Sequence, residues 1–175
     1  MVAQVFSMGL YGMDAFPVPV EADLSSGLPA FEMVGLPDAA VKESRDRVRA
    51  AMKNCGYKFP VSRITVNLAP ADKKKEGTLY DLPLLVALLK ASGQLAADLS
   101  GSVFLGELSL NGEARPVRGV LPMVMEAKKR GFRGCFVPRE NAAEGAVVEG
   151  IRVYPVADVP SLLAHLTGAK PLSPA

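Results

Sequence analysis

The feature that most constrains this chain is a helical pattern that has no polar face. Asp81 can cap a helix, Pro83 suits its first turn, and Gly93 can end the pattern. The side chains between these positions include Leu84, Leu85, Val86, Leu88 and Leu89. A helix that is apolar all round must be covered on most sides. The sequence therefore predicts a central helix, and 175 residues are enough to bury a substantial core around it.

Short strand and helix patterns surround this central helix. Period-two and buried apolar patterns predict strands at residues 2–10, 17–23, 31–34, 63–68, 135–137 and 152–156. Capping residues and apolar spacing predict helices at residues 38–55, 120–130, 139–144 and 158–167. The dipeptide Asn111-Gly112 predicts a type I′ hairpin turn between strands at residues 103–110 and 113–117. We expect a mixed α and β fold.

Charge and cysteine content bound the function classes. The formal net charge of +2 is too small to imply polyanion binding, so such an argument must rest on clustering. Cys55 and Cys135 lack a CxxC partner in a chain without a secretory signal, which favours inert, reduced thiols and a cytoplasmic location. No apolar run approaches the roughly 20 residues of a membrane span. We expect one domain at residues 1–168 and the start of a linker at residues 169–175.

One basic cluster has helical spacing. Lys42, Arg45, Arg49 and Lys53 are separated by three, four and four residues, so they form one stripe along the predicted helix at residues 38–55. Such a stripe can follow a phosphate backbone without sequence specificity, because few aromatic residues are free to stack on bases. The alternative is that these side chains lay their methylene stems on the core edge and keep their charges in water. Further cations that extend the surface, if the intervening loop folds towards this helix, are Arg63, Lys73, Lys74 and Lys75.

Three longer motifs carry a family resemblance. They are Gly27–Phe31 with Val34–Arg45, Ile64–Asp72, and Lys75–Gly77 with Asp81–Pro83. Together they resemble the amino-terminal, Lon-protease-like domain of the YifB/ComM group of Mg-chelatase-like AAA+ ATPases. The resemblance covers nearly the whole chain. It implies an α/β (α+β) fold of the Lon-protease-like kind, similar to the second domain of ribosomal protein S5, with a mixed sheet and packed helices.

The same resemblance implies a larger protein. Family members carry an AAA+ module with a GxxxxGK[ST] phosphate loop, and no such string occurs in this chain. ATP and Mg are therefore expected in that absent module, and we expect no cofactor in this chain. The full-length protein is implied to form a homo-hexamer that acts on DNA as a helicase or in branch migration during natural transformation. This domain would then be a noncatalytic part that aids ring assembly or guides DNA.

The second half also resembles the Lon catalytic domain. The motifs are Gly106–Gly112 with Pro116–Gly119, and Val137–Asn141. Lon proteases use a serine that is activated by a lysine. Aligned on those loops, this chain has Leu79 at the serine position and Leu121 at the lysine position. Neither leucine can attack a carbonyl or accept a proton, so the resemblance predicts a domain without peptidase activity.

Two alternative functions are also compatible with the sequence. Thr78 lies beside the nucleophile position and Lys73–Lys75 are close, which leaves a shifted Thr/Lys peptidase as an alternative. A protein-binding adaptor is another alternative. His165 is the only histidine and has no carboxylate or cysteine at metal-ligand spacing, so no metal site is predicted. Asp72, Glu76 and Asp81 are interpreted as loop-solvating and helix-capping residues.

Overall fold

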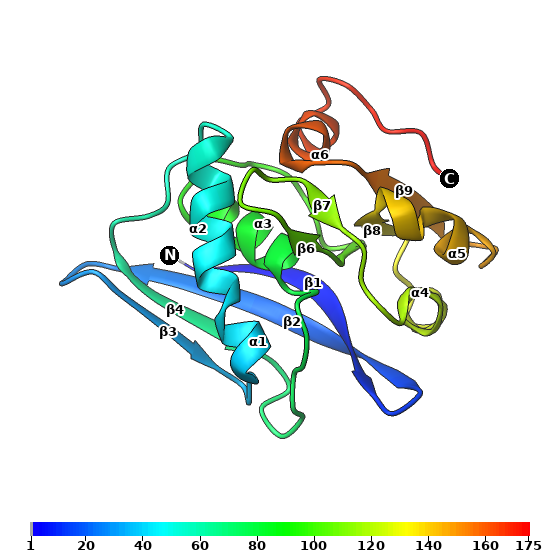
Figure 1. Cartoon of the computed structure of the whole chain (residues 1–175), viewed down its shortest axis with the longest axis horizontal. Coiled ribbons are helices and arrows are strands. Elements are labelled where there is room, and N and C mark those ends of the chain that lie inside the picture. Colours follow the sequence, from blue (N-terminus) through cyan, green and yellow to red (C-terminus); the bar gives the residue numbers. More distant parts are fainter. Residues whose placement is uncertain (1) are drawn as a thin grey trace.

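A seven-stranded mixed sheet organises the computed structural model, which describes residues 2–175 (Figure 1). Its strand order is β3-β4-β2-β1-β5-β8-β9. The strands are β1 (Val2–Tyr11), β2 (Asp14–Ser25), β3 (Ala30–Val34), β4 (Arg63–Leu68), β5 (Ser102–Phe104), β8 (Gly134–Pro138) and β9 (Arg152–Val156). β2 runs antiparallel to both β1 and β4, whereas the other neighbours in the sheet pair in parallel.

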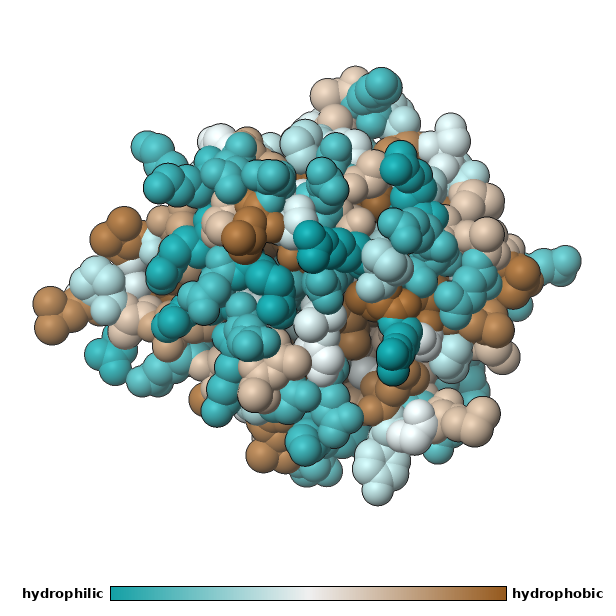
Figure 2. All heavy atoms as spheres, in the orientation of Figure 1, coloured by the Kyte–Doolittle hydropathy of each residue, from teal (hydrophilic) through white to brown (hydrophobic). Residues whose placement is uncertain are grey.

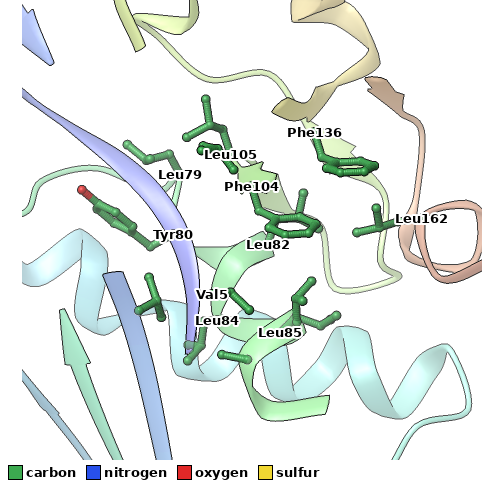
Figure 3. Packing of buried hydrophobic residues seen from close by; sticks show 14 of the residues in the cluster. Val5, Leu79, Tyr80, Leu82, Leu84, Leu85, Phe104, Leu105, Phe136 and Leu162 are labelled. Atoms are coloured by element: carbon green, nitrogen blue, oxygen red, sulfur yellow. The ribbon is translucent and has the colours of Figure 1, made fainter. Parts of the chain in front are cut away.

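Helices connect and cover these strands. They are α1 (Ala39–Lys42), α2 (Ser44–Asn54), α3 (Asp81–Ala91), α4 (Val120–Lys129), α5 (Ala142–Ala146) and α6 (Val159–Leu166), with a 3-10 turn at Arg139–Asn141. In Figure 1, α2 lies in front of α3, and α3 packs against β1 and β2. Figure 3 shows the apolar side chains of α3 inside the cluster that joins the sheet to the helices. The mixed α/β fold predicted from the sequence is confirmed.

The central helix α3 is covered on all sides. Every residue from Asp81 to Ala91 is buried except Lys90. The alternation of β2 supplies one wall of its surroundings, because Val18 and Val20 are fully buried while Pro17 and Pro19 are partly exposed. The prediction of a buried central helix is therefore confirmed. The capping role predicted for Asp81 is wrong, since residue 80 is the N-cap and makes no side-chain capping hydrogen bond.

The predicted helix at residues 38–55 forms with one interruption. Asp38 caps α1, because its carboxylate accepts a hydrogen bond from the Val41 amide at 2.8 Å. Glu43 separates α1 from α2, next to Ser44, whose hydroxyl is drawn inward to the Asp81 carboxylate. Helix α2 ends at Asn54, before Gly56. The sequence prediction placed both ends correctly and missed the break.

The predicted hairpin is shorter than expected. β5 joins the main sheet, and only β6 (Glu107–Leu108) and β7 (Ala114–Arg115) pair as an antiparallel ribbon. The type I′ turn is wrong, because Leu36 is the one non-glycine residue with positive φ within residues 2–175. Gly112 instead packs against Cys55 and Val159, and its carbonyl accepts the Val159 amide. These contacts with the ends of α2 and α6 set the shape of the connection.

The C-terminal residues 169–175 contain no helix or strand, yet they contact the domain. The Leu172 side chain packs on the core, and its amide donates to His165 Nδ1 at 2.8 Å. The Ala175 amide donates to the Val153 carbonyl of β9. None of the helices within residues 2–175 has the length and apolar character needed to cross a membrane.

Candidate functional site

The two positions predicted to align with the Lon dyad lie at the starts of two helices. Leu79 precedes α3, is 8% exposed, and belongs to the buried cluster shown in Figure 3. Leu121 lies in the first turn of α4, and its amide donates to the Glu144 carboxylate at 3.1 Å. Tyr80 lies close to Gly9, and Gly119 packs against Leu10, so both helix starts meet the same end of β1. Both positions hold aliphatic side chains without an ionisable group.

The lysine loop before α3 differs from the solvated loop predicted from the sequence. Lys75 is fully buried, and its Nζ donates to the carbonyls of Gly35 and Pro70. Burial lowers the pKa of the Lys75 amine, although nearby Asp72 opposes the shift. The backbone of Lys75 also exchanges hydrogen bonds with Leu36 and Asp38. Lys75 therefore holds this loop to the entry of α1, and the prediction that it contacts nucleic acid is wrong.

A buried ion pair joins α2, α3 and β6. Asp81 is fully buried and accepts hydrogen bonds from the Arg47 guanidinium at 2.6 and 3.1 Å, the Ser44 hydroxyl at 2.5 Å and the Leu108 amide at 3.0 Å. The hydrogen bond to Asp81 raises the pKa of Arg47. Burial raises the pKa of the Asp81 carboxyl, and its three hydrogen-bond partners oppose that shift. The sequence analysis did not predict this cluster. The one indication in the sequence was that Arg47 does not have the spacing of the basic stripe.

The basic stripe forms on the exposed side of the α1–α2 segment. Lys42, Arg49 and Lys53 are exposed, and Arg45 is half-buried. Arg45 lies 5.9 Å from the centroid of the Phe31 ring, and Arg49 lies 4.9 Å from that of Phe59. In Figure 2, hydrophilic side chains gather over α1 and α2, and hydrophobic patches lie at the edge near the turn between β2 and β3.

A groove of about 1360 Å³ runs beside this stripe. Helix α2, strand β3 and the segment 56–62 form its walls. Its basic residues are Arg45, Arg49, Lys53 and Lys58. Its aromatic residues are Phe31, Tyr57 and Phe59. Sequence analysis identified three of these cations but missed Lys58 and the aromatic wall, because segment 56–62 has no periodic pattern.

The other predicted cations do not join this groove. Arg63 alternates with the buried Ile64, which lines the groove, so Arg63 lies on the opposite face of the sheet. Lys73 lies 4.6 Å from the Phe16 ring centroid in β2, and Lys74 pairs with Glu76 at 3.6 Å. None of these three cations lines the groove, and their contact with nucleic acid stays a prediction.

The mixed sheet, with α3 and α4 starting at the same end of β1, forms an α/β domain. A family model described as subunit ChlI of Mg-chelatase matches residues 20–141. The chain therefore belongs to the Mg-chelatase ChlI family.

Residues 2–175 contain no cluster of three or more histidine, cysteine or carboxylate side chains that could hold a metal ion.

Several relatives match almost the whole chain. Protein YifB of Salmonella typhimurium is 45% identical over 95% of this chain and 33% of its own length. Competence protein ComM of Haemophilus influenzae is 41% identical over 98% of this chain and 34% of its own length. The chain thus spans about a third of the length of each of these two relatives. The resemblance to the YifB/ComM group inferred from the motifs is confirmed.

Two weaker matches extend the family context. Lon protease of Mycolicibacterium smegmatis is 25% identical over 90% of this chain and 21% of its own length, in accord with the Lon-like fold. DNA repair protein RadA of Haemophilus influenzae is 37% identical over 63% of this chain and 24% of its own length. The scaffold thus recurs in proteins whose names describe different activities.

Proposed function

We propose that this domain is a noncatalytic part of a Mg-chelatase-like AAA+ ATPase that acts on DNA, and that it guides DNA through contacts with the phosphate backbone. The carrying observation is the stripe of Lys42, Arg45, Arg49 and Lys53, four cations that face outward from one helical segment. A row of this kind contacts phosphates without reading bases. The cytoplasmic location and the assembly of a homo-hexameric ring belong to the same proposal.

The names of the relatives support DNA as the polyanion. ComM is a competence protein, and RadA is a DNA repair protein. ComM matches 98% of this chain and RadA matches 63% of it, and the name of RadA refers to DNA directly. ATP and Mg would be held by a separate AAA+ module, as in the family, and helicase or branch-migration activity would reside there.

The noncatalytic role rests on side-chain chemistry. Serine-lysine hydrolysis needs a hydroxyl and a neutral amine in contact. Leu79 and Leu121 provide neither, and the Lys75 amine donates to main-chain carbonyls. Incubation with unfolded casein tests this part. Cleavage that disappears on Thr78→Ala would overturn the noncatalytic assignment.

Salt-dependent DNA retention tests the phosphate contacts. The four stripe residues are changed together to glutamate, and retention of a 20-base-pair duplex is measured from low to moderate salt. A matched control changes four exposed cations elsewhere to glutamate: Arg118, Lys129, Arg139 and Lys170. We expect the stripe variant to bind the duplex weakly and to show a smaller fall of affinity with salt. The reason is that each lost phosphate contact means that fewer counterions are released on binding. Equal retention by the two variants would refute the proposal.

A further inference from the structure

The groove beside α2 contains aromatic residues that contacts with phosphates alone would not involve. We propose that it binds the bases of single-stranded nucleic acid while the stripe contacts the phosphates. This inference rests on the proposed function, and it names the form of nucleic acid that the site prefers. It also revises the expectation that aromatic residues are too few or too buried to stack on bases.

The charge of the groove selects an anionic occupant. Arg45, Arg49, Lys53 and Lys58 line it, and no aspartate or glutamate is among its lining residues. Cations gathered along a concave wall concentrate the field and attract a polyanion. A neutral or cationic peptide would gain no charge complementarity from this arrangement.

The aromatic wall supplies surfaces for stacking. Phe31 and Phe59 are half-buried and stack on each other with centroids 6.4 Å apart. Arg45 and Arg49 lie over these rings, which fixes two planar guanidinium groups at the groove. Aromatic rings and guanidinium planes are the surfaces on which unpaired bases stack in single-strand-binding proteins. Tyr57 adds a third ring to the same wall.

The wall is held in place by Gln94, which follows α3, and by the last turns of α2. Gln94 accepts a hydrogen bond from the Lys58 amide at 3.0 Å and donates one to the Lys58 carbonyl at 2.8 Å. The Tyr57 amide donates to the Met52 carbonyl of α2 at 2.8 Å. Residues 57 and 58 are therefore positioned before any ligand arrives, which lowers the entropic cost of binding.

The size of the groove favours a chain segment over a small molecule. Its volume of about 1360 Å³ exceeds the range of about 300–1,000 Å³ typical of small-ligand pockets. A duplex keeps its bases stacked and paired, so it cannot offer their faces to a protein wall. A single strand can stack its bases on Tyr57 and on the guanidinium planes that cover the two phenylalanine rings, with its phosphates along Lys53 and Lys58.

Fluorescence anisotropy with labelled oligonucleotides tests the inference. The 175-residue chain is titrated with a 20-nucleotide oligo-dT, an oligo-U and a duplex of 20 base pairs, each at two salt concentrations. We expect the single strands to bind roughly tenfold more tightly than the duplex, since stacking adds to phosphate contact. Equal affinity for single strand and duplex would overturn the inference and leave the proposed function standing. If none of the three nucleic acids binds, both the inference and the proposed function are overturned.

A variant pair isolates the stacking surface. Tyr57→Leu with Phe59→Leu keeps apolar bulk in the wall but removes two rings, and Tyr11→Leu removes an exposed ring outside the groove. We expect the groove variant to lose roughly tenfold in single-strand affinity while its duplex affinity stays unchanged. The Tyr11 control should match the parent chain. Unchanged single-strand binding in the groove variant would refute the role of the rings.

Photo-crosslinking keeps the inference testable if the groove variant does not fold. An oligonucleotide that carries 5-iodouracil is bound to the unaltered chain, irradiated, and the adducts are mapped by mass spectrometry. Adducts at Tyr57 or Phe59 are expected. Adducts confined to residues outside the groove would overturn the inference.

Discussion

The two faces of α2 use the same side-chain chemistry for opposite purposes. Arg47 points inward and binds the buried Asp81, whereas Arg49, two residues later, lies exposed over Phe59. The inward guanidinium has its charge satisfied within the protein. The outward guanidinium keeps its charge available. The comparison teaches that the position of an arginine on a helix, and not its presence in a basic run, decides whether it stabilises the fold or offers a contact.

The largest expected effect is loss of the inward ion pair. Asp81→Ala removes the counter-charge of Arg47 and leaves the Ser44 hydroxyl and Leu108 amide without their acceptor. We expect the free energy of unfolding to fall by about 3–5 kcal/mol, as when one partner of a buried pair is deleted. Urea denaturation measures it. Asp46→Ala, which removes an exposed partner of Arg45, is the control and should cost less than about 1 kcal/mol.

A second buried cation sharpens the contrast within the lysine loop. Lys75→Ala leaves the carbonyls of Gly35 and Pro70 without their donor. We expect a loss of about 1–3 kcal/mol, because unpaired buried acceptors keep their desolvation cost. Thermal or urea unfolding provides the measurement. Lys74→Ala, in an exposed pair with Glu76, should change stability by well under 1 kcal/mol, and equal losses in both variants would break the distinction.

The exposed arginine should show the reverse profile. Arg49→Ala removes a cation–π contact with Phe59 and should cost about 0.5–1 kcal/mol of stability. It should nevertheless weaken oligonucleotide binding severalfold, since one phosphate contact is lost. Arg47→Ala should destabilise the fold more than Arg49→Ala does. Under conditions where the Arg47 variant remains folded, its oligonucleotide affinity should be near that of the parent chain.

The smallest effect concerns the half-buried His165. Burial lowers the pKa of His165 from its ordinary value of 6.5, and its Nδ1 accepts the Leu172 amide. The unfolded chain therefore binds more protons than the folded chain just below pH 6.5, so stability falls as the pH drops through that value. The melting temperature is compared between pH 7.5 and 5.5. His165→Gln should lack this part of the decrease, and an identical decrease in both proteins would contradict the assignment.

Local pattern was enough to locate most elements. The strands at residues 63–68 and 152–156 have the boundaries predicted from alternation, and Asp38 caps the first helix as its sequence context indicated. These features depend on neighbours a few residues away, which a sequence displays directly. Asn111 is the exception, because contacts of Gly112 with Cys55 and Val159 override the turn preference of the dipeptide.

The candidate site was less predictable. The stripe on α2 followed from helical spacing, but the groove needed Lys58, Tyr57 and Phe59 from a segment without regular structure. The opposite placement of Arg63 depends on strand alternation relative to the buried face. No local signal reports where a loop packs, so the aromatic wall was invisible before the fold was known.

By itself the sequence determined the class of fold, the buried central helix and the family, and it predicted leucines at the two positions of the Lon dyad. Tertiary structure alone decided which charges are buried and which are offered to a ligand. Asp81 looked like a cap and Lys75 like a solvated cation, yet both are fully buried. The physical reason is that helical spacing sets neighbours on one element, whereas burial and pairing of a charge depend on segments distant in the chain.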